Sequence, residues 1–447
     1  MSEAVKAVQN KGWTVTLAGL GINLALGILY TYSIFKEAIS ASIKAHDGRF
    51  TWDLANLNDP YAVCCLMFAF AMIFAGRLQD KLGPRLIAVI GGILTGLGLM
   101  WVSLSYSLVT WVLGFGVLMG MGLGFGYASA TPPAIKWFAP SKTGMIAGIV
   151  VAGFGLASVY IAPLSEFLIH RFGLSTSMMV FGGGFLVVVC TLAQFLVNPP
   201  AGYKPEGVPA ANPAATQAST HLADFEPAEV MRTGAFYKLW LMFAIGSGAG
   251  LMIIGNVAGM AKQSLGAMAW VVVALMAVGN AGGRVVAGIL SDKIGRMRTV
   301  TIMMTAQSAI MVALLMLGSA NAAFMVFAAT FVGFNYGTNL SLFPTSTKDF
   351  FGLKNFGANY GLVFTAWGVG GFILPKVSQM IVAATGNFNA AYVTAAILLA
   401  LSAGISLMTK APKKVLVPGK AEFAPVAGSA SFPVSPFFSH LLKKIDK

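Results

Sequence analysis

Hydrophobic residues fill this chain in long runs, which are separated by short segments rich in glycine, proline and charge. Each run is about 20 residues long, the length that an α-helix needs to cross the hydrocarbon layer of a bilayer. The runs do not alternate apolar and polar positions, as the strands of a membrane β-barrel do. The pattern predicts an all-α membrane protein with twelve transmembrane helices, roughly at 13–35, 57–77, 86–105, 109–133, 143–168, 176–197, 236–260, 268–290, 299–318, 322–344, 357–382 and 390–409.

A polar segment divides the predicted helices into two sets of six. It begins as NPPAGYKPEGVPAANPAATQASTH, and a composition of proline, alanine and polar residues is typical of a linker. We therefore expect an N-terminal six-helix half over residues 1–197, a cytoplasmic linker over 198–232, a C-terminal six-helix half over 233–410 and a cytoplasmic tail over 411–447.

Composition and charge agree with a membrane protein. Of the 447 residues, 57% are hydrophobic and only 10% are charged, against about 25% in soluble proteins. Lysine and arginine concentrate in alternate loops, which places both termini in the cytoplasm and the chain in the inner (plasma) membrane by the positive-inside rule. Because the net charge of +14 is dispersed over short loops, the expected partner is the lipid bilayer and not nucleic acid. The cations of the opposite loops are Lys36, Lys44, Arg49, Arg171 and Lys262.

One arginine lies deep in an otherwise apolar run. Arg284 belongs to WVVVALMAVGNAGGRVVAGIL, and no aspartate or glutamate lies deep in any other predicted helix. A cation at membrane depth costs at least a few kcal/mol and marks a pathway or a ligand site. The sequence therefore predicts an anionic substrate as its partner; the alternative is a structural arginine bonded to backbone carbonyls. Asn280 lies four residues earlier on the same helix face, where it can hold Arg284 or contact the substrate.

Other function classes lack their signatures. The three cysteines lie in apolar runs and none of the four histidines lies deep in one, so we expect no metal site, no cofactor and no enzyme activity. The chain has no phosphate-binding G-x-x-x-x-G-K-[ST] loop, which argues against an ATP-driven pump. A receptor without transport activity is not supported, because no segment is long enough for a sizeable soluble domain.

A short motif occurs twice, once after the second helix of each half. Residues 75–85 read AGRLQDKLGPR and residues 287–297 read AGILSDKIGRM, and both contain G-x-L-x-D-K-x-G. The aspartates can bond backbone amides at a neighbouring helix N-terminus, and Gly83 and Gly295 allow a tight turn. The flanking cations can pair across a cytoplasmic gate. The predicted gating residues are Asp80, Lys81, Arg85, Asp292, Lys293 and Arg296.

This repeated loop resembles the signature of the major facilitator superfamily. The strings NAGGRVVAGILSDKIGR, LFPTSTKDFFG, NFGANYG and KWFAPSKTGMIAG are similar to those of the oxalate:formate antiporter branch and, more distantly, of eukaryotic monocarboxylate transporters. The resemblance covers essentially all twelve predicted helices. It implies two parallel halves with the substrate between them at mid-membrane.

The resemblance also implies a set of site residues. In the antiporters a lysine of the eleventh helix helps to hold the second carboxylate of oxalate, and the corresponding position here is Trp367. One buried cation neutralises one carboxylate, and a second would stay charged and desolvated, which is costly. This favours a monocarboxylate such as lactate or pyruvate, with helix packing as the alternative role of Trp367. The further candidates, each of which could instead serve interhelical packing, are Tyr30, Tyr127, Tyr336, Phe154 and Phe364.

Proton coupling has no evident carrier in the sequence. The monocarboxylate transporters have an acidic residue where this chain has Asn280, and a lysine where it has Leu29. The acids nearest the predicted helices are Asp59, Glu166 and Glu37, at outer helix ends, so we expect the proton to travel through water or on the carboxylic acid itself. Lys376, near the outer end of its helix, can snorkel to the interface or attract anions in an outer vestibule.

The prediction is a secondary transporter of small monocarboxylates, by proton-coupled symport with the proton as co-substrate. The alternative is a carboxylate exchanger such as an oxalate:formate antiporter.

Overall fold

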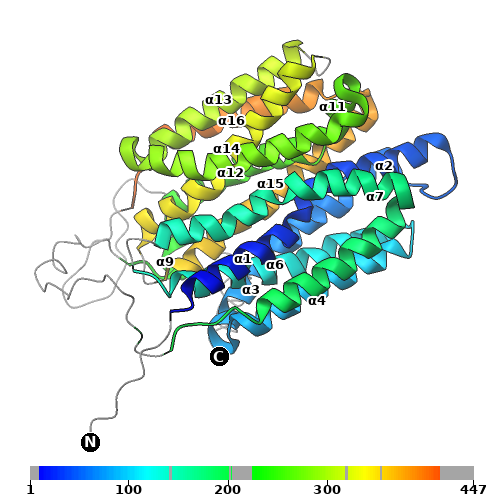
Figure 1. Ribbon diagram of the computed structural model, residues 1–447. Helices are drawn as coiled ribbons and strands as arrows, with labels where there is room; N and C mark the ends of the chain where they lie inside the picture. The colour runs from blue at the N-terminus through cyan, green and yellow to red at the C-terminus, as the bar shows by residue number, and fades with distance from the viewer. Residues whose placement is uncertain are drawn as a thin grey trace, which may run out of the picture.

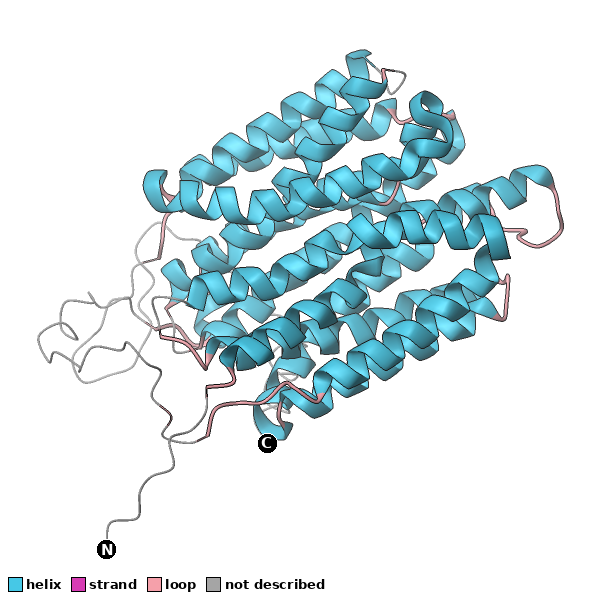
Figure 2. Cartoon of the chain, viewed as in Figure 1, coloured by secondary structure: helices cyan, strands magenta, loops and turns pink. Residues whose placement is uncertain are grey.

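The computed structural model describes residues 10–139, 143–200, 203, 224–317, 321–352 and 355–412. Every regular element in these ranges is helical (Figure 2). Most of the predicted linker and nearly all of the predicted tail lie outside the described residues, as does the side chain of Asp80.

The N-terminal half is built from long apolar helices joined by short turns (Figure 1). Its first crossing is one continuous helical stretch, in which the 3-10 turn Gly27–Thr31 joins two α-helices. Its fourth begins with a short helix and a wide π-helical turn, Val112–Met119. The α-helices are α1 (Gly12–Leu26), α2 (Tyr32–Ala45), α3 (Asp59–Leu82), α4 (Pro84–Ser103), α5 (Leu108–Trp111), α6 (Gly120–Ile135) and α7 (Thr143–Ala193).

The C-terminal half repeats this plan. The short helices α9 (Pro227–Val230) and α11 (Val257–Leu265) flank its first long helix. The long helices are α10 (Gly234–Ile254), α12 (Ala269–Ile294), α13 (Arg296–Leu317), α14 (Ala322–Phe351), α15 (Phe356–Thr385) and α16 (Asn389–Leu407).

The described helices make twelve crossings, as predicted. Ten helical stretches are long and apolar enough to span a membrane. One of them, Met145–Ala193, is kinked at Gly173, where a φ of 81° reverses the chain, and it therefore crosses twice. Helix α14, with 30 residues, is a further crossing. The chain is an all-α membrane protein with two six-helix halves.

Helix pairing shows that the halves are structural repeats. In the N-terminal half, the first helix packs on the fifth (α1 on α7), the second on the fourth (α3 on α6) and the third on the sixth (α4 on α7). The C-terminal half repeats these pairs as α10 on α15, α12 on α14 and α13 on α16. The halves meet along two seams, where α7 packs on α12 and α3 packs on α15. A ligand between these seams would contact both halves.

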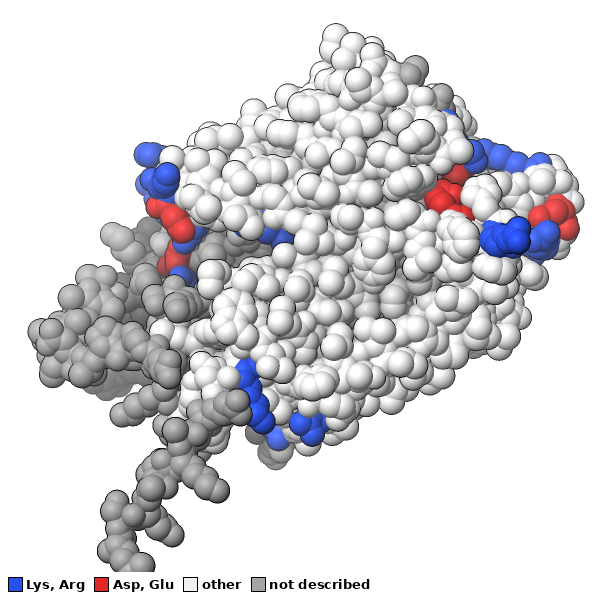
Figure 3. All heavy atoms as spheres, viewed as in Figure 1, with Lys and Arg blue, Asp and Glu red and all other residues white. Residues whose placement is uncertain are grey.

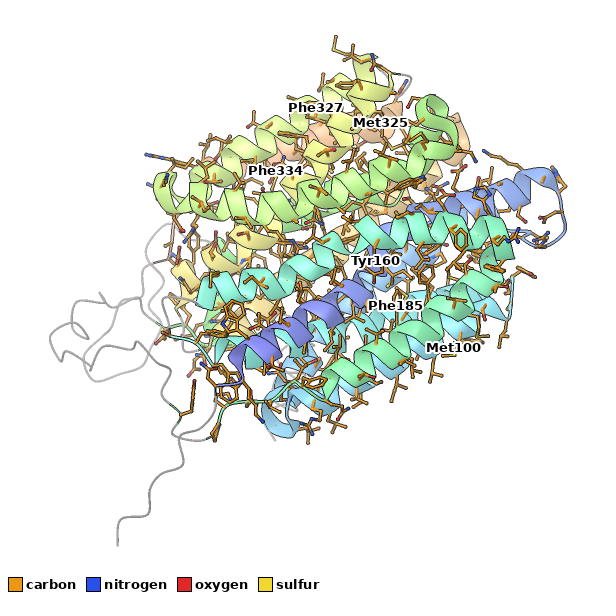
Figure 4. The ribbon with its side chains drawn as sticks, viewed as in Figure 1. Met100, Tyr160, Phe185, Met325, Phe327 and Phe334 are labelled. Atoms are coloured by element: carbon orange, nitrogen blue, oxygen red, sulfur yellow. The ribbon has the colours of Figure 1, made fainter. Side chains whose placement is uncertain are left out.

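Charged side chains gather at the two ends of the bundle, and the face between them is mostly uncharged (Figure 3). We call the end where α1 begins and α16 ends the terminal end, and the other the opposite end. Side chains fill the spaces between the ribbons: Phe185 and Met325 are buried, whereas Tyr160 and Phe327 lie on the surface of the bundle (Figure 4). An apolar belt between two polar ends is the surface that a bilayer requires.

The repeated motif forms the predicted turns at the terminal end. Gly83 and Gly295 both have positive φ, 88° and 96°, and each separates two long helices. Arg296 pairs with Asp292 at 2.5 Å and with Asp349 at 3.0 Å, so this cation pairs within its own half. Lys81, Arg85 and Lys293 are exposed at the same end. The expected pairing of the motif's cations with the other half stays a prediction.

Candidate functional site

Arg284 lies on the seam between α12 and α7, with only 9% of its surface exposed. Its Nε donates to Oδ1 of Asn280 at 3.1 Å, and one terminal nitrogen, Nη1, donates to the backbone carbonyl of Val151 on α7 at 2.8 Å. The other, Nη2, is buried and makes no hydrogen bond to the described residues, and the Tyr127 side chain lies beside the guanidinium. None of the ion pairs among the described residues includes Arg284. The guanidinium therefore offers one buried donor and an uncompensated positive charge at the interface of the halves.

The local sequence of α12 explains how this arginine reaches the interface. Gly279 and Gly283, four residues apart, face backbone carbonyl groups of α14, and Gly333 and Gly337 of α14 face backbone carbonyl groups of α12, so the backbones of the two helices touch there. A Cβ at position 283 would lie 1.8 Å from the carbonyl oxygen of Phe334. Small residues at this spacing let membrane helices approach closely. The room that the glycines leave is therefore filled by α14, and Asn280 and Arg284 face α7.

Two tyrosines join the halves beside this arginine. The hydroxyl groups of Tyr30 and Tyr336 lie 2.7 Å apart, and Nε1 of Trp367 donates to the Tyr336 hydroxyl at 2.7 Å. All three side chains are buried, with Trp367 only 1% exposed. Tyr30 and Tyr127 both lie close enough to Arg284 to interact with it electrostatically. The polar groups that sequence reasoning selected from five helices thus meet in one place.

Aromatic rings close the site on its apolar side. Phe154 packs edge-on against Tyr30 and Tyr127, with ring centroids 5.0 and 5.5 Å away, and Phe364 stacks on Trp367 at 5.3 Å. Phe68 on α3, which the sequence analysis did not select, contacts four members of this cluster. It lies in a continuous apolar run, and nothing in the sequence distinguishes it from the neighbouring phenylalanines of α3.

A small cavity borders the site. It has a volume of about 10 Å³, lies between the halves and is lined in part by Tyr30, Ser158, Met276 and Asn280. Such a volume has room for about one water molecule. A carboxylate bound in this cavity would therefore require the halves to move apart.

Polar contacts hold the halves together at the opposite end. Lys376 on α15 pairs with Asp59 on α3 at 2.5 Å and also donates to Asn56. Asn58 donates to the carbonyl of Pro375 at 3.0 Å, again across the seam. An acid of the other half therefore binds Lys376, whose side chain is 26% exposed. The two roles expected from its sequence position, a cation at the interface or in an outer vestibule, stay predictions.

One sequence-based placement is wrong. Lys36 was expected in a loop, but α1, the 3-10 turn and α2 run on as a helical stretch of 34 residues, Gly12–Ala45. This length carries Lys36 to the interface between the two halves, where only 6% of its surface is exposed. The apolar run ends near Phe35, and a span of about 20 residues predicted that the helix would end there as well.

The paired repeats and the site between them can be compared with known proteins. A model of the Major Facilitator Superfamily matches residues 12–375, with a second match over residues 241–445. The chain belongs to the Major Facilitator Superfamily. The expectation drawn from the repeated loop is thereby confirmed.

Several curated members of the superfamily are similar to this chain over most of their length. An uncharacterized MFS-type transporter, YhjX of Escherichia coli (strain K12), is 30% identical over 366 residues, which cover 81% of this chain and 86% of that protein. The oxalate:formate antiporter of Oxalobacter formigenes is 24% identical, over 80% of this chain and 81% of its own. Monocarboxylate transporter 13 of Rattus norvegicus is also 24% identical, over 91% and 93%. These relatives match the branch that the sequence motifs indicated.

A solved structure supports the fold. A bacterial homologue of the human lysosomal transporter Spinster superposes with a TM-score of 0.64, covering 91% of this chain and 98% of its own at 16% identity. The chain is a secondary transporter of the Major Facilitator Superfamily and passes through the membrane many times.

Proposed function

We propose that this transporter carries small monocarboxylates of the lactate or pyruvate type, in symport with a proton and by alternating access. The observation that carries the proposal is the buried Nη2 of Arg284, which makes no hydrogen bond to any residue that the structure describes. A carboxylate supplies both an acceptor and a negative charge, and a hydrogen bond between ionised partners is about twice as strong as a neutral one. Arg284 is the proposed anchor, and Asn280 keeps its guanidinium in place.

Charge and shape support a monocarboxylate over a dicarboxylate. The cluster around Arg284 contains one guanidinium, three tyrosines that line it and a wall of phenylalanine and indole rings. Trp367 stands where the antiporter branch has a lysine, so a second carboxylate would face a ring and not a cation. A short apolar tail fits against such a wall. The proposed substrate residues are Arg284, Asn280, Tyr127, Tyr336, Trp367, Tyr30, Phe364 and Phe154.

The position of the anchor supports a rocking mechanism. Arg284 belongs to the C-terminal half and donates to Val151 of the N-terminal half. A substrate carboxylate that replaced this carbonyl would loosen the seam between α7 and α12. We expect the terminal end to lie on the cytoplasmic side of the inner membrane, since the basic loops collect there. In the outward-open state this end is expected to be closed by the gating residues Asp80, Lys81, Arg85, Asp292, Lys293 and Arg296.

A carboxylate exchanger is the second candidate, and the similarity to the oxalate:formate antiporter favours it. Symport of a monovalent anion with one proton moves no net charge, whereas exchange of a divalent for a monovalent anion does. Uptake into wild-type proteoliposomes separates the two. Symport predicts that an inward proton gradient drives lactate uptake and that an imposed membrane potential has no effect. Uptake of oxalate that needs preloaded formate, and that responds to membrane potential, would replace symport by exchange.

A further inference from the structure

Three lysines lie at the opposite end of the interface between the halves, and one of them differs from the other two. Lys262 pairs with Glu37 at 3.1 Å, and Lys376 pairs with Asp59 at 2.5 Å. The ammonium of Lys36 instead donates to two amide oxygens, Oδ1 of Asn256 and, at 3.3 Å, Oε1 of Gln379. Lys36 is the most deeply buried of the three, yet no ion pair among the described residues includes it.

The two amides are fixed with their oxygens toward Lys36. The Nδ2 group of Asn256 donates to the carbonyl of Met252 at 2.6 Å, and the Nε2 group of Gln379 donates to the carbonyl of Leu54 at 2.7 Å. Neither amide can turn its donor group toward an anion while these bonds hold. In the closed state the amide oxygens therefore accept from Lys36, and they carry no charge that could neutralise an ammonium group.

Opening of this end must separate Lys36 from its partners. Lys36 belongs to α2 in the N-terminal half, whereas Asn256 precedes α11 and Gln379 lies on α15 in the other half. Once it loses both acceptors, Lys36 has no bond to the other half and is open to a partner that enters from this end. A carboxylate replaces the two lost bonds and also neutralises the charge, which the amides do not do. Glu37, the adjacent acid, is already bound to Lys262.

Lys36 also lies between the opposite end and the candidate site. Tyr30, whose hydroxyl borders the site, precedes it by six residues in the same helical stretch. At 1.5–2.0 Å per residue, Lys36 lies about 10 Å further toward the opposite end. An anion that enters from this end would therefore meet Lys36 first and Arg284 second.

We propose that Lys36 is a carboxylate-capture residue, which exchanges the amide oxygens of Asn256 and Gln379 for the carboxylate of the substrate as the opposite end opens. The inference rests on the proposed function, because it assumes a carboxylate substrate. It adds a second binding position to the path and couples opening of that end to the arrival of an anion.

The proposal is tested by uptake of lactate from the side of the membrane that the opposite end faces, in matched variants. Lys36→Gln keeps a donor for the amides but removes the charge, and Lys36→Arg keeps the charge. Lys262→Gln removes an exposed cation at the same end and serves as the control. Loss of one charge-assisted bond predicts that Lys36→Gln raises the half-saturation concentration of lactate about tenfold or more. Lys36→Arg and Lys262→Gln are expected to stay near the wild type.

Two outcomes distinguish this inference from the proposed function. Wild-type protein that takes up no carboxylate defeats the proposed function. Wild-type uptake combined with an unchanged half-saturation concentration in Lys36→Gln, and only an altered maximal rate, makes Lys36 a latch and defeats this inference alone.

A second measurement does not depend on the folding of Lys36 variants. A membrane-impermeant acetylating reagent is applied to the Arg284→Gln protein, and modification of Lys36 is read by mass spectrometry with and without lactate. Capture predicts that lactate protects Lys36 even though the central anchor is absent. Equal modification with and without lactate would overturn the proposal.

Discussion

The hydroxyl groups of Tyr30 and Tyr336 lie 2.7 Å apart and link the two halves of the transporter beside Arg284. The Tyr336 hydroxyl also accepts a hydrogen bond from Trp367, so one oxygen joins three helices. Any movement that opens the site breaks the bond between the tyrosines. The same hydroxyl groups are then free to bind a carboxylate oxygen, as buried tyrosines require a partner.

This relationship predicts coupled effects of the two tyrosines. A net contribution of about 0.5–1.5 kcal/mol for one hydrogen bond corresponds to a loss of roughly twofold to tenfold in uptake for Tyr30→Phe or Tyr336→Phe. Since both substitutions break the same bond, the double variant is expected to lose less than the product of the two single losses. Tyr160→Phe, which alters a bond within the N-terminal half, is the control. Strictly multiplicative losses would mean that the hydroxyl groups act independently.

Trp367 sets the proposed preference for one carboxylate. Replacement by lysine places a second cation near Arg284, so Trp367→Lys is expected to shift uptake toward oxalate relative to lactate. Trp367→Phe keeps an apolar ring without a charge and is expected to retain the preference for lactate. Competition of each acid against radiolabelled lactate in proteoliposomes measures the shift. An unchanged profile in Trp367→Lys would show that charge counting does not determine the substrate.

The backbone contact between α12 and α14 predicts a stability effect. A methyl group at position 283 would meet a backbone oxygen at 1.8 Å, which only a movement of the helices can relieve. Gly283→Ala is therefore expected to destabilise the protein by about 1–3 kcal/mol or more and to lower its thermal unfolding midpoint in detergent. Gly404→Ala on α16, where the added group meets nothing within 4 Å, is the matched control. Equal midpoints for the two variants would contradict the close packing of these helices.

If no buried carboxylate carries the proton, the acidic residues at the opposite end should not be needed for proton coupling. Asp59 is bound to Lys376, and Glu166 lies beside His170 near the kink of α7. Asp59→Asn and Glu166→Gln are expected to keep the stimulation of lactate uptake by a proton gradient, even where the maximal rate changes. If either variant bound lactate normally but lost that stimulation, the neutralised acid would be the proton carrier.

The sequence was sufficient for the architecture because helix length and continuous apolar runs determine it. Arg284 was also predictable, since a lone cation in an apolar run is conspicuous. Phe68 was not, because a phenylalanine that lines a site has the same sequence signal as one that packs against a neighbour. Lys36 was misplaced for a different reason: the end of an apolar run marks where a helix leaves the hydrocarbon layer, and not where the helix itself ends.

The most direct test of the proposed function uses Arg284, whose guanidinium is the proposed anchor for the substrate. Uptake of radiolabelled L-lactate into proteoliposomes is measured with an inward proton gradient, for the wild type, Arg284→Lys and, as the control, the exposed Arg171→Lys. Lysine keeps the charge but not the planar fork that bonds Asn280 and Val151. We expect gradient-driven uptake in the wild type and Arg171→Lys, and a loss of at least about tenfold in Arg284→Lys, which corresponds to about 1.4 kcal/mol. Near-normal uptake by Arg284→Lys would contradict this expectation.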